Sequence, residues 1–437
     1  MFQITLALKI MTVILTVPVT GTIDLTPIDN TDGEWVAPGY EVITELDFDP
    51  LEYVDDAQAA QAFFMDTDDG EKLRLILVGD DRVLVFDEPW DSYREYAIEE
   101  PWNLRFVTFS RNGKYLSLTT SRTETVTSEG GFREWEERYY NGILLEITED
   151  EIATEYFDPS PGGFGYFRYV SNEGSVAGSN ELGVISLIPQ GDVDGFLARV
   201  FGTIAWQRRG CSYDNSLIAL GNVGNDRGER VIKGFDWSGN QLWDAPIGDR
   251  NLTSLRVSPS GEYVLAPARN GGVVCYSGED GSRLWETAEG LLCDFPQISP
   301  NGNYWIMAPD EIDHYYFYFG KVDEHNNLDN LSVCEFLPGT MHPVCLNVND
   351  LGYSLVWIGD PDSDITRTLF LTPDQNPLWV SNEFSLYYES INYEFTVHAQ
   401  HVDHYFKSTI SAISENGDRI CYTDYQTIRV IRFDEVN

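Results

Sequence analysis

Apolar and polar residues alternate along short segments of this chain, and pairs of such segments are separated by a polar tetrapeptide of the form Ser-x-x-Gly. Alternation with a period of two predicts half-buried strands. Ser, Pro, Asn and Gly are the residues that tight turns favour, and Gly suits the last turn position. The clearest copies span 255–265 and 297–306, with turns at Ser258–Gly261 and Ser299–Gly302. Each copy therefore predicts a β-hairpin.

The hairpin turns recur along the whole chain. Five of the eight copies keep both Ser and Gly, and successive copies start 41 to 65 residues apart. Most intervals match the roughly 40–45 residues of a four-stranded repeat unit. We interpret the longer ones as insertions in loops between units, for example at Thr125–Tyr140 and Ser381–Phe406. The turns begin at Thr67, Ser110, Ser171, Ser212, Ser258, Ser299, Asn349 and Ser414.

A second repeated element follows several hairpins: an apolar strand, a polar turn with Gly or Pro, and a strand that carries Leu-Trp. It occurs at 235–243, 274–285 and 370–379. It resembles the outer hairpin of quinoprotein-like (pyrroloquinoline-quinone-like) β-propellers, and the Ser-Pro-x-Gly-x-Tyr hairpins resemble those of WD-repeat propellers. The resemblance covers roughly Phe63 to Phe433. It implies an all-β propeller whose Trp243, Trp285 and Trp379 are packed as wedges between blades.

The turn count predicts eight four-stranded blades, or seven if the irregular Thr67–Gly70 copy does not begin a blade. The C-terminal repeat lacks an outer strand, and the alternating segment Tyr40–Phe48 can supply it by pairing with Thr427–Phe433. Such pairing closes the ring and removes an open sheet edge. We expect a single propeller domain over 40–437, preceded by a linker over 22–39, and little helix.

The first residues have the pattern of a signal peptide. Lys9 precedes an apolar run, Ile10–Val19, and Val19-Thr20-Gly21 provides modest side chains at a cleavage site. We expect residues 1–21 to be removed and the protein to be secreted, into the extracellular space or a periplasm. A short N-terminal membrane anchor is the alternative. No second apolar run of spanning length follows.

Six cysteines lie between Cys211 and Cys421. Cys334 and Cys345 flank an expected crossover from an outer to an inner strand, so we prefer them as a disulfide pair. Cys211 and Cys345 can equally be free thiols on inner strands. The chain has no adjacent cysteines and no Cys-x-x-Cys-His motif, which weakens a redox-enzyme hypothesis.

The formal net charge is −43, from 28 basic and 71 acidic residues. Such a field repels nucleic acid and anionic membranes. It favours either simple solubility, as in a salty habitat, or the attraction of cations or a basic partner.

Three of the six histidines fall in one segment, at His398, His401 and His404. On a strand they would face opposite sides, but in a loop or helical turn they could converge on zinc together with Asp403. The acidic runs Asp66–Gly70 and Asp360–Asp364 have partial calcium-loop patterns. Each of these segments also reads as an ordinary solvated stretch without metal.

Signatures of catalysis are otherwise absent: the sequence has no Gly-x-Ser-x-Gly, no His-Glu-x-x-His and no phosphate-binding Gly-rich loop. We therefore predict a secreted, non-catalytic module that binds an unknown protein or a glycan. An extracellular enzyme on the same scaffold, either a quinoprotein-like oxidoreductase or a polysaccharide lyase that uses the histidine cluster, is the alternative hypothesis.

Overall fold

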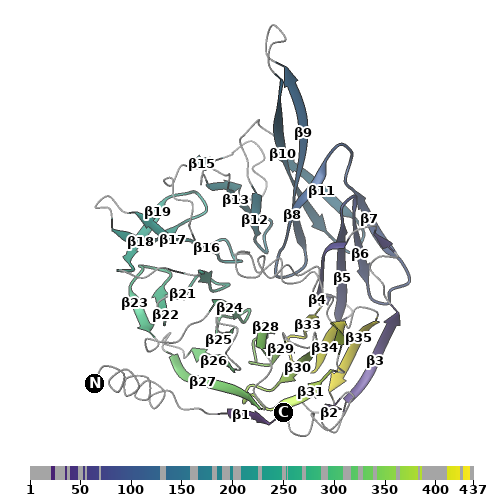
Figure 1. Ribbon diagram of the computed structural model, residues 1–437, viewed down its shortest axis with the longest axis vertical. Helices are drawn as coiled ribbons and strands as arrows, with labels where there is room; N and C mark the ends of the chain where they lie inside the picture. The colour runs from purple at the N-terminus through teal and green to yellow at the C-terminus, as the bar shows by residue number, and fades with distance from the viewer. Residues whose placement is uncertain are drawn as a thin grey trace.

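Eight sheets, whose blade strands pair antiparallel, are arranged around a common axis in the computed structural model (Figure 1). Every element whose bounds the structure describes is a β-strand, as expected for a propeller. No helix in the described part of the chain is long and apolar enough to span a membrane. The structure describes residues 21–24, 35–36, 40–47, 53–54, 57–67, 70–127, 134–157, 166–179, 185–188, 197–199, 208–224, 229–248, 252, 254–267, 272–286, 294–308, 316–322, 328–337, 342–360, 365–381, 384–385, 411–423 and 427–433.

The sheets follow one another along the chain, and we number them as blades 1 to 8. Within each blade, strands pair with their neighbours in sequence, because each connection is a hairpin. Blade 1 holds β4 (Ala57–Thr67), β5 (Gly70–Gly79), β6 (Arg82–Asp87) and β7 (Tyr93–Ala97). Blade 2 holds β8 (Asn103–Phe109), β9 (Tyr115–Thr127), β10 (Glu134–Ile147) and β11 (Ile152–Phe157). Blade 3 holds β12 (Tyr166–Val170), β13 (Val176–Ser179), β14 (Ile185–Ile188) and β15 (Leu197–Arg199). Blade 4 holds β16 (Arg208–Cys211), β17 (Ile218–Gly224), β18 (Arg230–Phe235) and β19 (Gln241–Pro246).

The second half of the ring repeats this order. Blade 5 holds β20 (Arg256–Val257), β21 (Tyr263–Pro267), β22 (Val273–Ser277) and β23 (Arg283–Glu286). Blade 6 holds β24 (Asp294–Ile298), β25 (Tyr304–Ala308), β26 (Tyr316–Val322) and β27 (Leu328–Leu337). Blade 7 holds β28 (His342–Val348), β29 (Ser354–Asp360), β30 (Ile365–Leu371) and β31 (Pro377–Val380), with β32 (Phe384–Ser385) beside β30. Blade 8 holds β33 (Ser411–Ile413), β34 (Arg419–Thr423) and β35 (Thr427–Phe433).

The N-terminal segment runs along the outer edges of the last three blades. β3 (Tyr40–Asp47) pairs antiparallel with β35, so the predicted closure of the ring by the two ends of the chain is confirmed. Two shorter strands lie in the segment expected as a linker. β1 (Gly21–Asp24) pairs parallel with β27, and β2 (Trp35–Val36) pairs antiparallel with β31. Figure 1 shows these purple strands outside the green and yellow blades.

The predicted hairpin turns connect the first two strands of each blade. The Thr67–Gly70 copy, on which the choice between seven and eight blades depended, joins β4 and β5 of a separate sheet. Seven of the turns end in a Gly with positive φ, and blade 4 has Asn215 at φ 63° in that position. Gly and Asn tolerate this left-handed conformation best, which explains their choice here.

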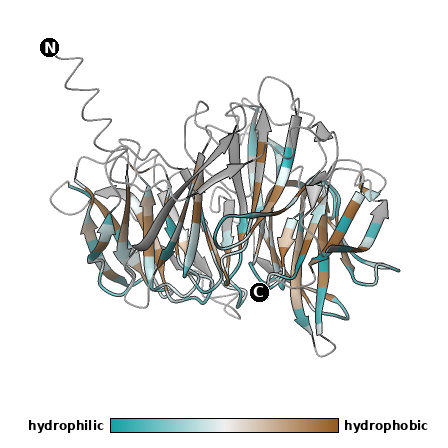
Figure 2. Cartoon of the chain, turned by 90° about the horizontal axis from the view of Figure 1, so that it is seen from below, coloured by the Kyte–Doolittle hydropathy of each residue, from teal (hydrophilic) through white to brown (hydrophobic). Residues whose placement is uncertain are grey.

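The hydrophobic core is divided among the gaps between blades. Eight clusters of buried side chains occur, one for each pair of neighbouring blades, including the pair of blades 8 and 1. Hydrophobic positions lie along the strands and hydrophilic ones at many hairpin ends (Figure 2). Because each sheet covers the face of its neighbour, no blade can bury its apolar residues alone.

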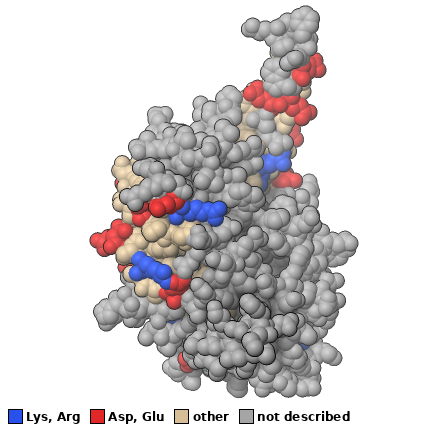
Figure 3. Space-filling model, turned by 60° about the vertical axis from the view of Figure 1, so that its left-hand side comes forward, with Lys and Arg blue, Asp and Glu red and all other residues tan. Residues whose placement is uncertain are grey.

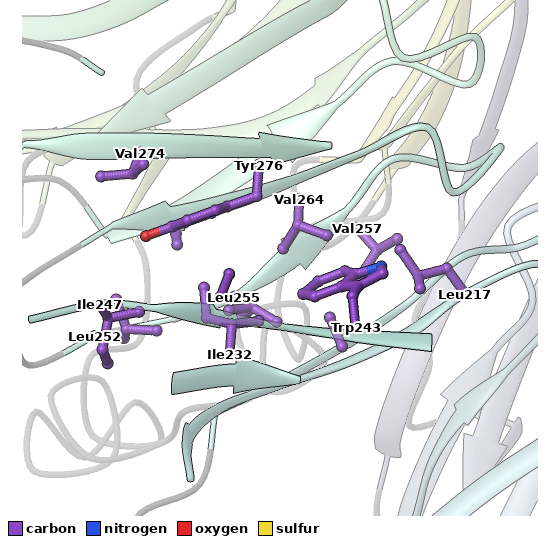
Figure 4. Close-up of a cluster of buried hydrophobic side chains, with 13 residues drawn as sticks. Leu217, Ile232, Trp243, Ile247, Leu252, Leu255, Val257, Val264, Val274 and Tyr276 are labelled. Carbon is purple, nitrogen blue, oxygen red and sulfur yellow. The ribbon is translucent and has the colours of Figure 1, made fainter. Parts of the chain in front are cut away.

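The cluster between blades 4 and 5 illustrates this packing (Figure 4). Ile232 and Trp243 of blade 4 meet Val264, Val274 and Tyr276 of blade 5. These side chains come from strands of two different blades, so the contact exists only in the assembled ring.

One sequence interpretation is wrong. The segment Thr125–Tyr140, expected as an inserted loop between blades, is the end of the β9–β10 hairpin within blade 2, where Thr127 pairs with Glu134. Its Thr, Val, Trp and Tyr residues favour extended backbone, so the two strands continue past the sheet instead of ending in a loop. We call the part from Arg122 to Tyr139 the arm. It projects from the ring in Figure 1.

Candidate functional site at the axis of the ring

The first turns of the blades are built around a buried hydroxyl. Ser110, Ser258, Ser299 and Ser414 are completely buried. In each, Oγ accepts a hydrogen bond from the backbone N–H five residues later, at 2.8–3.1 Å. In blade 7 the Oδ1 atom of Asn349 accepts the corresponding N–H, from Tyr353, which explains why Asn replaces Ser in this copy.

Neighbouring turns interlock through an aromatic ring and a glycine. In four blades, a Tyr just after the turn packs against the turn Gly of the next blade, so that a Cβ atom there would crowd the ring; these residues are Tyr115, Tyr263, Tyr304 and Tyr353. A Cβ on Gly352 would lie 2.8 Å from Cε1 of Tyr304, and one on Gly417 would lie 2.4 Å from Cδ2 of Tyr353. The motif Ser-x-x-Gly-x-Tyr therefore encodes a contact between blades as well as a turn.

Backbone hydrogen bonds also join the turns. Asn172 N–H donates to Tyr213 O at 2.9 Å, and Tyr213 N–H donates to Pro259 O at 2.9 Å. Asn301 N–H donates to Oδ1 of Asp350 at 2.6 Å. Together with the side chains, these bonds make a continuous ring of turns, which we call the turn ring.

Arg111, in the turn of blade 2, reaches across the turn ring. Its Nη1 donates to the carbonyl of Ile298 at 2.6 Å, and Ile298 belongs to blade 6, four blades away. Its guanidinium lies over the ring of Tyr213 in blade 4, 5.7 Å from the centroid. In a ring of eight blades, blades 2 and 6 are opposite, so the guanidinium lies at the axis.

The surroundings of Arg111 are poorly solvated. Burial lowers the pKa of Arg111, against the opposing influence of Tyr213 and Asp350. Burial also raises the pKa of Asp350, although its hydrogen bond from Asn301 and the charge of Arg111 act in the other direction. The pKa of the nearby Tyr263 phenol is raised well above its usual value by burial.

A second feature is the arm. From Arg122 to Thr127, β9 pairs only with β10 among the described residues, because β8 begins opposite Ser121 and β11 ends opposite Gly142. The arm base is fixed by the Arg122 guanidinium, which lies 4.8 Å from the Trp102 ring centroid and 5.4 Å from that of Tyr139. Acidic side chains gather on this projection (Figure 3).

The three predicted tryptophans each contact the following blade. Nε1 of Trp243 donates to Gly278 O at 2.7 Å. The Trp285 ring stacks on Trp305 with centroids 5.9 Å apart, and the Trp379 ring meets Tyr422 edge-on at 4.8 Å. Their role as stabilising wedges stays a prediction that mutagenesis must test.

The predicted metal ligands His398, His401 and His404 lie outside the described residues. Among the residues that the structure does describe, no group of three or more His, Cys, Asp or Glu could hold a metal ion. Zinc and calcium therefore stay predictions. The side chains of Cys334 and Cys345 also lie outside the described set, although their strands β27 and β28 belong to successive blades as expected. Cys275 and Cys421 are buried free thiols, and Cys211 is partly exposed.

Sequence reasoning missed both Arg111 and the arm. The signal for Arg111 was present, since it is the one basic residue at the second position of the eight turns, where the other copies carry Pro, Asn, Asp, Glu or Tyr. The contact of Arg111 with the opposite blade depends on the diameter of the ring, and no local sequence pattern predicts that diameter.

No family model matches the chain, and no curated protein matches it. Among solved structures, the C-terminal WD40 domain of Sif2 aligns with 92% of this chain and 100% of that domain, at 10% identity and a TM-score of 0.51. A structure of the eukaryotic initiation factor aligns with 80% of this chain and 90% of its own, at 9% identity and a TM-score of 0.45, too low to support an argument. At 10% identity, the first likeness shows the fold alone, and that fold is a β-propeller similar to WD40 domains.

Proposed function

We propose that this protein is an exported, non-catalytic interaction module that binds a partner protein through the arm. The observation that carries the proposal is the projection of β9 and β10 beyond their own sheet with both edges unpaired in the described residues. Unpaired strand edges are templates for pairing with another chain. An isolated two-stranded hairpin gains little stability in water, so a projection of this length fits a binding role better than a structural one.

The charge of the arm indicates the kind of partner. Glu124, Glu134 and Glu136 are exposed, and the whole chain carries a net charge of −43. A basic partner segment would be attracted from a distance and held by strand pairing at short range. The leader pattern of Met1–Gly21 supports export, and the partner would then be met outside the cell or in a periplasm.

A shortened arm tests the proposal. Residues 123–138 are replaced by Asn-Gly, so that Arg122 and Tyr139 still face each other across a two-residue turn. The probe is an extended peptide of alternating Lys and Thr, and its affinity is measured by fluorescence anisotropy at two salt concentrations. We expect the parent to bind and the shortened variant to lose binding.

A control that removes acids elsewhere in blade 2 keeps the arm intact. Glu149→Gln with Asp150→Gln removes two exposed acids from the same blade and should leave the affinity unchanged. Equal binding by the parent and the shortened variant would refute the arm as the docking element. Binding of glycans but of no peptide would favour a carbohydrate ligand and would also reject this proposal.

A further inference from the structure

Arg111 is a charged group at the axis of the ring that has no carboxylate ion pair among the described residues. The other arginines that join blades are paired with carboxylates: Nε of Arg74 lies 2.7 Å from Oδ1 of Asp87, and Arg419 pairs with Glu71. Arg111 forms no ion pair with a carboxylate in the part of the chain that the structure describes. Charges removed from water are normally paired, because an unpaired one is costly.

Asp350, the acid that interacts electrostatically with Arg111, forms no ion pair with it in the described structure. Asp350 interacts electrostatically with Arg111, but its Oδ1 already accepts the Asn301 N–H at 2.6 Å. Burial makes the charged form of Asp350 less favourable and raises its pKa. The turn ring therefore places a positive charge on the axis and leaves its neutralisation incomplete.

One edge of the guanidinium is open. Its single hydrogen bond within the described structure uses Nη1, so the edge formed by Nε and Nη2 has no acceptor there. Arg111 as a whole residue keeps partial exposure to solvent, while burial still lowers the pKa of its guanidinium. The Nε and Nη2 donors form the planar fork that binds an oxyanion through two parallel hydrogen bonds.

We propose that Arg111 is the centre of a ligand site at the ring axis that binds a carboxylate group. The Tyr213 ring supports the guanidinium from one side and holds its plane in place. The Ile298 carbonyl fixes the other side, so the fork is set before the ligand arrives. A preorganised donor loses less entropy on binding than a free arginine does.

The charge of the protein selects among anions. At a net charge of −43, and with Asp350 close to the site, a doubly charged phosphate is repelled more strongly than a singly charged carboxylate. A monocarboxylate also matches the planar geometry of the fork. Its source could be a small organic acid, a sugar acid or the C-terminus of a peptide.

Calorimetric titrations of the full chain at low salt distinguish these sources. The probes are acetate, glucuronate, the dipeptide Ala-Ala and inorganic phosphate. We expect at least one carboxylate to bind more tightly than phosphate. Arg111→Gln, which keeps a donor for Ile298 but removes charge and fork, should weaken that binding roughly tenfold or more. Arg111→Lys, which keeps only the charge, should also weaken it.

Two further variants make the outcome decisive. Asp350→Asn keeps an acceptor for Asn301 and removes the competing negative charge, so it should tighten carboxylate binding. Arg82→Gln alters an exposed arginine of blade 1 and should change nothing. If Arg111→Gln does not fold, the Asp350→Asn variant decides the question. A carboxylate affinity of Asp350→Asn equal to that of the parent then overturns the proposal.

Equal carboxylate binding by the parent and Arg111→Gln, no binding of any probe by the folded parent, or tighter binding of phosphate than of every carboxylate would each overturn the assignment. The variant with the shortened arm should bind the carboxylate normally. Carboxylate binding therefore tests the axial site alone, and peptide binding tests the arm alone, so that one hypothesis can fail without the other.

Discussion

The ring of Tyr353 in blade 7 lies directly over Gly417 in the first turn of blade 8, so close that a Cβ on Gly417 would meet the Cδ2 atom of Tyr353 at 2.4 Å. The same contact joins other neighbouring blades, and it explains why the turn motif couples a glycine to an aromatic residue. Each repeat carries one half of the contact and receives the other half from its neighbour.

Gly417→Ala should therefore be unusually destabilising. Gly417 has φ 74°, which costs an alanine about 1 kcal/mol, and the clash with Tyr353 adds roughly 1–3 kcal/mol of overpacking. Gly248→Ala is the matched control, because Gly248 has φ 62° but nothing within 4 Å of an added Cβ. Thermal unfolding should show a clearly larger loss for Gly417→Ala, whereas equal losses would mean that only the backbone conformation matters.

Trp243→Ala should lower the free energy of unfolding by roughly 3–5 kcal/mol, as expected for a large aromatic side chain removed from a core. Trp243 is 6% exposed, and a Cβ on Gly281 of blade 5 would touch its ring. Trp285 is partly exposed, so Trp285→Ala should cost less. Urea denaturation measures both, and a Trp243→Ala curve that overlays the parent curve would reject the wedge role.

Asp350 should make the stability of the ring depend on pH. Its pKa in the folded protein is raised by burial above the ordinary value of 3.8. The stabilisation from the protonated form is thus complete below about pH 4 and is lost as the pH rises through the folded pKa. Asp350→Asn should raise the melting temperature at pH 7 relative to the parent and have little effect below pH 4. A constant difference between the two proteins from pH 3 to 7 would contradict this.

Cys211, Cys275 and Cys421 should differ in reactivity. Burial raises the pKa of Cys275 and of Cys421 well above the ordinary value, and both side chains are inaccessible. Because the thiolate is the nucleophile, we expect partly exposed Cys211 to be alkylated by iodoacetamide before either of them. Mass spectrometry of labelled peptides reads the order, and early labelling of Cys421 in the native protein would disagree with its place between blades 8 and 1.

The sequence predicted the parts of this fold that depend on local chemistry. Turn residues and alternating strands identified the eight hairpins. Tyr40–Phe48 was recognised as the missing outer strand because the C-terminal repeat has one strand fewer than the others. The arm was misread, since a polar insertion with alternating Thr and Glu looks the same whether it forms a loop or continues a hairpin. Arg111 went unnoticed because its partners Ile298 and Tyr213 come from distant repeats, and only the closed ring brings them together.

The pairing of β3 with β35 tests the closed ring most directly. Glu41 and Arg432 are opposite each other in this pair and exposed, so cysteines at both positions should form a disulfide under mild oxidation. Peptide mapping by mass spectrometry should then find residues 41 and 432 joined in the native protein, whereas a pair at 41 and 82, with position 82 on the second hairpin of blade 1, should stay unjoined. Failure of the 41–432 pair to cross-link while the protein is folded would contradict a ring closed by its two chain ends.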